Sequence, residues 1–264
     1  MHRASSSVSR RLLPAVLLLP VLLGLGACGG ADKIVFVYPD EALDFQLRNL
    51  KMPAVYIDAV TDMRPPEQRQ GQGHFFTIVY PKDEAWEVPA TQVYGEALAK
   101  DLAQTHMLEL VPLRAQAEYT LSADLFSMAC RLERSPAAFL LTGAIGAGAG
   151  VALGEDGSDR AKLAAVLGAV AIAAIPVPTR NIAEVDVRLT LRDNDGDIVW
   201  QKACLGEVDE NKYLTPTARE DQQLVNEHLT RAVKRANACL LGQLRQFLLE
   251  EGQRRAEETE KAGG

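Results

Sequence analysis

The sequence lacks every short motif that commonly marks a catalytic or cofactor-binding site. Its 264 residues contain no nucleophile elbow, no phosphate-binding glycine loop with its lysine and no dinucleotide-binding fingerprint. The four histidines, His2, His74, His106 and His228, lie far apart, and none has a second histidine or a cysteine three or four residues away. We therefore expect no catalytic residues, no metal site and no cofactor.

The sequence also lacks the excess of basic residues that nucleic-acid-binding proteins carry. Lysine and arginine total 28 against 35 aspartates and glutamates, which gives a formal net charge of −7. Aromatic residues make up only 6% of the chain, so no stripe of aromatic and basic side chains is available to stack on bases. We therefore expect no nucleic-acid partner.

Charge is absent from residues 12–27, which directly follow Arg10 and Arg11. A basic start, a short apolar run and the small residues Gly26 and Ala27 are typical of a cleaved export signal. The run is too short to span a bilayer comfortably, and its two prolines would interrupt an uncleaved anchor helix. We predict a signal peptide over residues 1–27.

The stretch Leu25-Gly26-Ala27-Cys28 resembles the bacterial lipobox. This resemblance implies that Cys28 becomes the first residue of the mature chain and carries acyl chains such as palmitate, which would bind it to membrane lipid. Two or more acyl chains anchor a protein stably. Gly29 at the second mature position, in place of aspartate, favours the periplasmic face of the outer membrane. The alternative is an ordinary cleaved signal followed by an incidental cysteine.

Cysteine is scarce, with four in the chain. If lipid occupies Cys28, then Cys130, Cys204 and Cys239 remain, and an odd number cannot all pair within one chain. Cys130 and Cys204 both fall on predicted strands, so they are a possible disulfide in an oxidising periplasm. Free buried thiols are the alternative.

Two hydrophobic periods alternate along residues 53–250. Spacings of three and four predict helices over residues 91–107, with Thr91 as N-cap, and over residues 221–250. Alternation of apolar and polar residues predicts strands at residues 53–62, 75–80, 108–113, 117–132, 183–192 and 198–206. The phase slips after Leu125, which predicts a bulge or a strand end buried on both faces. The fold class is α+β, a mainly antiparallel sheet with two helices packed on one face.

An acidic turn joins the last two predicted strands. Asp193, Asp195 and Asp197 are spaced like the start of a calcium loop of the EF-hand type, but Ile198 and Cys204 stand where that loop needs glycine and glutamate. The turn is therefore predicted to be a structural hairpin turn and not a metal site.

An apolar insert occupies residues 137–177 and interrupts the α+β pattern. Residues 137–153 and 163–177 contain no charge, and a charged turn separates them. Two apolar arms joined by a polar tip predict a helical hairpin. Each arm would be roughly 25 Å long, against about 30 Å for the hydrocarbon core of a bilayer.

Small residues recur every fourth position in this insert, at Gly146, Gly150 and Gly154 and again at Ala164 and Gly168. The spacing resembles the glycine-zipper segments of bacterial envelope proteins. It favours close contact between helices, so we predict these glycines to make a membrane or homo-oligomer contact. Packing of the hairpin on the domain and a flexible lid are alternatives.

The order of elements from about residue 54 to residue 249 resembles small envelope lipoproteins of the YajG-like and transport-auxiliary type. The stretches that carry the resemblance are residues 55–64, 119–125 and 185–200. The expected organisation is a signal peptide (1–27), a lipidated tether and N-terminal segment (28–52), an α+β domain (53–250) interrupted by the insert, and a frayed charged tail (251–264).

The resemblance implies a lipid-anchored, non-catalytic periplasmic accessory subunit of an envelope transport or assembly machine, with envelope proteins as partners. The alternative is a self-assembling outer-membrane pore or secretion component. An envelope hydrolase is a third class, which would need an acid, a base and a nucleophile clustered in a pocket.

Overall fold

The structure is a computed structural model, and it describes residues 33–41, 43, 52–71, 73, 76–153, 157–174, 176–214 and 222–263. The predicted signal peptide and Cys28 lie outside these residues. The chain divides into two compact units, Met1–Lys33 and Ile34–Gly264, and the fold described below is that of the second unit.

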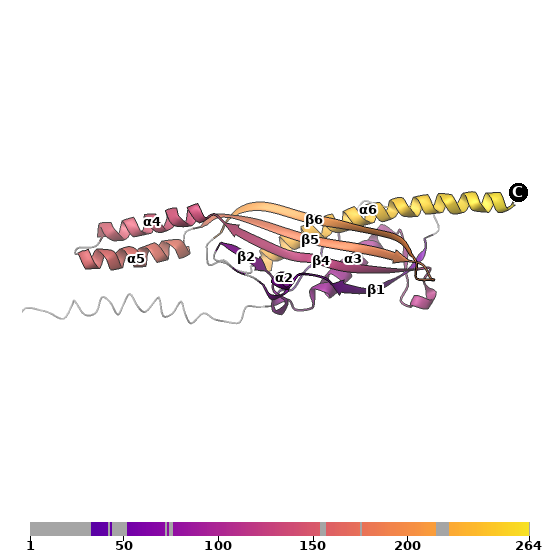
Figure 1. The fold of residues 1–264 in the computed structure, drawn as a ribbon, viewed down its shortest axis with the longest axis horizontal. Coiled ribbons are helices and arrows are strands. Elements are labelled where there is room, and N and C mark those ends of the chain that lie inside the picture. Colours follow the sequence, from indigo (N-terminus) through magenta and orange to yellow (C-terminus); the bar gives the residue numbers. More distant parts are fainter. Residues whose placement is uncertain are drawn as a thin grey trace, which may run out of the picture. The chain divides into compact units, whose positions relative to one another are not determined.

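One mixed sheet forms the centre of this unit (Figure 1). Its strands are β1 (Ala54–Asp62), β2 (Thr77–Tyr80), β3 (Glu109–Leu110), β4 (Tyr119–Arg134), β5 (Val177–Arg192) and β6 (Ile198–Leu214). The order is β3-β1-β4-β5-β6, and β2 also pairs with β4. The pairs formed by β4 with β2, β4 with β5 and β5 with β6 are antiparallel, whereas β1 runs parallel to both β3 and β4. The predicted α+β class with a mainly antiparallel sheet is confirmed.

The predicted phase slip in β4 is a β-bulge. The register between β4 and β5 shifts between Leu125 and Ser127, so an extra residue of β4 faces its partner strand there. Both β5 and β6 are longer than the alternation indicated, and at the start of β5 the reason is that Thr179 and Asn181 are buried and have no exposed surface. Polar side chains at core positions hide the alternation that the prediction relies on.

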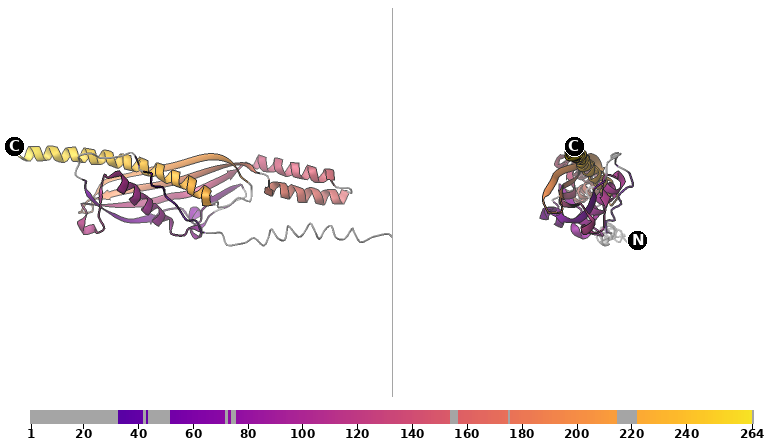
Figure 2. Two further views of the ribbon diagram at one scale, coloured as in Figure 1. Left: turned by 180° about the vertical axis from the view of Figure 1, so that it is seen from behind. Right: turned by 90° about the vertical axis from the view of Figure 1, so that its right-hand side faces the viewer.

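Two long helices, α3 (Ala90–Thr105) and α6 (Gln222–Gly263), cover one face of the sheet, as Figure 2 shows from behind. Their apolar sides pack on the inward side chains of β4, β5 and β6 to form the hydrophobic core. Helix α6 crosses β6 very closely at Gly206, where an added Cβ would lie 2.0 Å from the carbonyl oxygen of Ala232. No larger residue fits there without moving the helix.

Three local predictions are wrong. Helix α3 starts at Ala90 after Pro89 and has no side-chain cap, so Thr91 is not its N-cap. A short helix, α2 (Pro66–Gln70), lies between β1 and β2, where the periodicity predicted no helix. Residues 251–263 do not fray, because α6 continues through them with ion pairs one turn apart such as Arg254 to Glu251.

Candidate membrane-contact site

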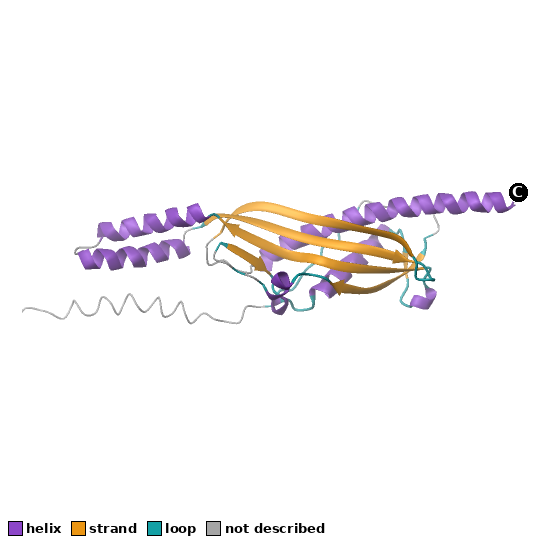
Figure 3. Cartoon of the chain, in the orientation of Figure 1, coloured by secondary structure: helices purple, strands orange, loops and turns teal. Residues whose placement is uncertain are grey.

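The apolar insert forms two antiparallel helices, α4 (Pro136–Leu153) and α5 (Gly157–Ala174), which confirms the predicted helical hairpin. Ser135 caps α4 by accepting a hydrogen bond from the amide of Ala138, and Pro136 occupies the first helical turn, where its missing N–H costs nothing. The hairpin continues beyond the edge of the sheet where β4 ends and β5 begins (Figure 3). We call this edge the hairpin end of the domain and the opposite edge, with the turn at residues 193–197, the turn end.

Small residues fill the interface between the two arms. An added Cβ on Gly146 would lie 2.5 Å from the Cβ of Ala171 and 2.5 Å from the carbonyl oxygen of Leu167. An added Cβ on Gly168 would lie 3.4 Å from the carbonyl oxygen of Gly143. These glycines allow the backbones of α4 and α5 to approach closely, so the small-residue stripe is used inside the hairpin.

Large aliphatic side chains project outward from the same two helices. Their exposed fractions run from 46% at Val166 to 76% at Leu140. This outer apolar face consists of Leu140, Leu141, Ile145, Val151, Leu153, Val166 and Val170. Large exposed apolar side chains gathered on one pair of helices favour a contact with a membrane or with another protein.

Polar groups are almost absent along α4. Thr142 is the exception, and its hydroxyl donates a 2.7 Å hydrogen bond to the carbonyl oxygen of Ala138 within the helix. The charged side chains of α5 cluster at the tip, at Asp159, Arg160 and Lys162. Among the described residues, α4 is the helix that is long and apolar enough to cross a membrane by length and composition, and 12% of its apolar window is buried.

The glycines predicted to make a membrane or homo-oligomer contact therefore do not all have the same position in the hairpin. Gly146 and Gly168 lie between the arms, so they support the outer face without being part of it. Gly150 lies on α4, and Gly154 and Cys28 fall outside the described residues. The sequence analysis missed the outer apolar face itself, although its leucines and valines are visible between the small residues.

The predicted disulfide is wrong. Cys204 forms a disulfide with Cys239 of α6. Cys130 is a free cysteine, and its burial raises the pKa of its thiol to about 12. Cys130 lies on β4 opposite Ala183 of β5, whereas Cys204 lies on β6 opposite Val187 of β5, so their backbones are separated by more than two strand spacings, which alone are about 9.5 Å. That separation exceeds the reach of a disulfide.

An extended segment at the start of the described chain runs alongside α6. Along this segment, Asn226 donates to the carbonyl oxygen of Val35 at 3.1 Å, Thr230 to that of Val37 at 3.4 Å and Lys234 to that of Glu41 at 2.6 Å. The two sets of numbers increase together, so the segment runs in the same direction as α6. Since α6 starts at the hairpin end, the segment also starts there.

A buried polar network fixes this segment on α3 and α6. Asp101 of α3 has no exposed surface and forms a 2.7 Å ion pair with Lys234. The Asp101 carboxylate also accepts a 2.7 Å hydrogen bond from Asn237 and a 2.5 Å hydrogen bond from Tyr38 of the segment. Burial, and then the hydrogen bond to Asp101, raise the pKa of Tyr38 above its ordinary value. The hydroxyl of Tyr94 completes the network with a bond to Asn237 at 3.0 Å.

A second polar cluster brings together Glu210, Glu227 and His228, whose potential ligand atoms lie within 4.8 Å of one another. Both carboxylate oxygens of Glu210 are already engaged, one by His228 at 3.0 Å and one by Arg231 at 2.6 Å. The other ring nitrogen of His228 shares a 2.9 Å hydrogen bond with Asn181. Hydrogen bonds from His228 and Arg231 lower the pKa of Glu210 to about 2. The cluster is thus an ion-paired network, and we assign no metal to it.

The acidic turn at the turn end forms the predicted hairpin connection between β5 and β6. The Asp193 carboxylate accepts hydrogen bonds from the amides of Asp195 and Asp197 at 3.0 and 2.9 Å, and Gly196 adopts a positive φ of 91°. These are the interactions of a turn in which an aspartate binds its own backbone.

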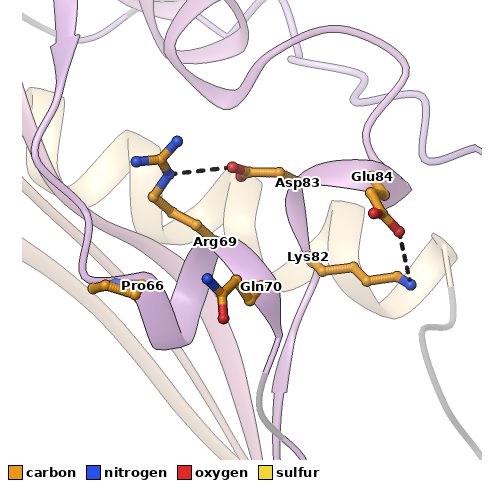
Figure 4. Close-up of a pocket in the computed structure, with 6 residues that line it drawn as sticks. All are labelled: Pro66, Arg69, Gln70, Lys82, Asp83 and Glu84. Carbon is orange, nitrogen blue, oxygen red and sulfur yellow. Dashed lines mark hydrogen bonds and ion pairs between the residues drawn. The ribbon is translucent and has the colours of Figure 1, made fainter.

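A polar depression of about 450 Å³ lies between α2 and the residues after β2 (Figure 4). Its charged side chains are paired with each other, Arg69 with Asp83 at 3.3 Å and Lys82 with Glu84 at 3.2 Å. None of the described residues that line it is a histidine or a serine, threonine or cysteine nucleophile, so these residues do not form the cluster of acid, base and nucleophile that a hydrolase site requires.

Comparisons with known proteins leave the family open. No family model matches the sequence, and no curated protein matches it. A solved structure of a DUF330 protein from Xanthomonas campestris is similar with a TM-score of 0.43 and 9% identity, over 83% of this chain and 99% of that one. A homologue of the neuraminyllactose-binding hemagglutinin from Helicobacter pylori gives 0.39 and 9%, over 87% and 99%. A lipoprotein from Neisseria meningitidis gives 0.25 and 7%, over 66% and 91%. TM-scores below 0.5 carry no argument about function.

Proposed function

We propose that this protein is a lipid-anchored, non-catalytic accessory protein of the bacterial cell envelope, whose hairpin enters a lipid bilayer. Its role would be that of a subunit of a transport or assembly machine, held at the periplasmic face of the outer membrane by acylated Cys28. The observation that carries the membrane contact is the distribution of side chains on the hairpin, with small residues between the arms and large aliphatic ones outside.

Lipid fits this surface better than water does. Exposed leucine and valine side chains gain roughly 1.5–3 kcal/mol each when they leave water, and the outer apolar face carries seven such side chains, isoleucine included. Thr142 is the polar side chain of α4, and its hydroxyl already donates to the carbonyl oxygen of Ala138, so it does not oppose transfer of α4 into hydrocarbon. With 18 residues, α4 is about 27 Å long, close to the thickness of a hydrocarbon core of about 30 Å.

The experiment is vesicle flotation with the mature chain carrying Cys28→Ala, so that acyl chains cannot supply the binding. We expect this protein to float with phospholipid vesicles and Leu141→Glu to lose flotation, because a charge inside the hydrocarbon core is costly, up to about 3 kcal/mol at its centre. Leu113→Glu is the matched control, since Leu113 is 59% exposed and lies on the domain rather than on the hairpin.

The runner-up, a self-assembling pore or secretion component, uses the same outer apolar face between copies of the chain. It predicts a defined multimer in detergent that Leu141→Glu dissociates. Equal flotation of both glutamate variants, or flotation of neither, would contradict the membrane contact. A detergent-stable multimer without vesicle binding would favour the runner-up.

A further inference from the structure

We infer that the hairpin and the acyl chains of Cys28 enter the same membrane, and that the domain stands on it with the hairpin end down and the turn end away. This inference rests on the proposed function, because it requires both attachments to exist. It adds their relation to each other, which follows from where the N-terminal segment leaves the domain.

The exit point of the chain is fixed by the contacts of Val35. Its carbonyl oxygen binds Asn226, which lies in the second turn of α6, and α6 starts at the hairpin end. The network around Asp101 fixes the direction of the segment, because Tyr38 is held further along α6 at the level of Lys234 and Asn237. The first described residues, Lys33 to Val35, therefore lie nearer the hairpin end than the residues of the segment that follow them.

The length of the connection between Cys28 and Val35 determines at which end of the domain Cys28 can reach a membrane. Seven residues from Cys28 to Val35 span at most about 24 Å when fully extended. Strand β4 has 16 residues and therefore extends over about 53 Å. A tether that starts near the hairpin end can bring Cys28 to a membrane at that end, but it is too short to reach one at the turn end.

The position of the hairpin supports the same orientation of the domain on the membrane. Helices α4 and α5 continue beyond the hairpin end (Figure 1). Their charged residues belong to the first turns of α5, at the tip, and α4 has none. Insertion of the hairpin tip first would bring Asp159, Arg160 and Lys162 to the far interface, where long charged side chains can reach water. Both attachments then act on one bilayer, and the strands stand steeply on it.

The test uses the acylated full-length protein reconstituted into phosphatidylethanolamine and phosphatidylglycerol vesicles with brominated acyl chains, which quench tryptophan fluorescence at short range. The variant Leu141→Trp places a reporter on the hairpin, and Asp195→Trp places a matched reporter at the turn end. The emission that each variant adds to that of the native tryptophans is measured. In a second arm the protein is reconstituted into unlabelled vesicles, a second population of brominated vesicles of the same composition is added, and vesicle clustering is followed by light scattering.

We expect loss of most of the added emission for Leu141→Trp, no loss for Asp195→Trp, and no clustering. If Leu141→Trp is quenched only by a second, brominated vesicle population and the vesicles cluster, the hairpin enters a different membrane and the inference fails while the membrane contact stands. Quenching of Asp195→Trp would overturn the orientation. Absence of quenching of Leu141→Trp by either population would overturn the proposed function itself.

Discussion

Lys234 of α6 forms a 2.7 Å ion pair with Asp101 of α3, whose side chain has no exposed surface. The pair joins the two helices that cover the sheet, and it also holds the N-terminal segment through Tyr38 and the carbonyl oxygen of Glu41. Removal of the lysine would leave an uncompensated carboxylate in the interior.

The first prediction follows from this pair. We expect Lys234→Met to lower the free energy of unfolding by about 3–5 kcal/mol, because one partner of a buried pair is then left unpaired. Urea unfolding of the mature domain measures the change. The double variant Asp101→Asn/Lys234→Met is the control, and it should cost less than Lys234→Met alone. A double variant that is no more stable than the single one would contradict a buried ion pair.

The second prediction concerns lipidation of Cys28. Cys28→Ala should leave the protein without acyl chains, since a lipidation signal needs the thiol, and intact-protein mass spectrometry of membrane fractions should detect no diacylglyceryl addition. Cys130→Ala, at a buried free cysteine, is the control and should be lipidated normally. Normal cleavage after Ala27 and an unmodified Cys28 in the native chain would refute this prediction.

The third prediction separates the two faces of the hairpin. We expect Gly146→Leu to force α4 and α5 apart, because an added Cβ there would already lie 2.5 Å from its neighbours. Gly148→Leu adds the same side chain at a position with nothing within 4 Å, so it should leave the hairpin intact. Amide hydrogen exchange over residues 136–174 in vesicles is the measurement. Similar exchange rates for the two variants would disprove close packing of the arms.

The fourth prediction concerns the disulfide between Cys204 and Cys239, which are 35 residues apart in sequence. Its removal by Cys239→Ser should destabilise the domain by about 2–4 kcal/mol, since the closed loop restricts the unfolded chain. Alkylation with and without reductant should identify this pair and leave Cys130 unmodified in the folded protein. Alkylation of Cys239 without reductant would show that the pair does not form.

The fifth prediction is a pH dependence. The pKa of Glu210 falls from its ordinary 4.5 to about 2 on folding, mainly through His228 and then Arg231. A lowered carboxylate pKa contributes stability above pH 4.5, and this contribution is lost as the pH falls from about 4.5 to about 2. Glu210→Gln should therefore show a flatter loss of stability in this range, whereas Glu257→Gln, on the exposed end of α6, should follow the native profile. Equal slopes for Glu210→Gln and the native protein would count against the network.

The sequence predicts secondary structure most accurately where a single hydrophobic period extends through the whole element. Residues 183–191 alternate strictly between apolar and polar, and they form a central strand with every apolar member buried. The periodicity fails where polar residues turn inward, as at Asn181, which meets His228 of α6 inside the domain. Such partners come from distant elements, so local periodicity cannot supply them.

The candidate site was predicted in its position but not in the use of its residues. Uncharged arms and a charged tip identified the hairpin, because length and composition are local properties. Whether Gly146 faces the other arm or an external partner depends on how the arms rotate against each other, and that is a property of packing. The disulfide prediction was wrong for the same reason, because α6 brings Cys239 next to Cys204 of β6 from 35 residues further along the chain.

The short connection between Cys28 and Val35 has a kinetic consequence. If Cys28 is acylated and inserted in a membrane, a tether of at most about 24 Å keeps Val35 within that distance of the surface and so keeps the hairpin near the membrane. Its effective concentration there is in the millimolar range or above, so lipid competes strongly with other apolar surfaces that the hairpin could meet in solution. An anchor placed at the turn end would lack this advantage and leave the leucines of α4 open to aggregation.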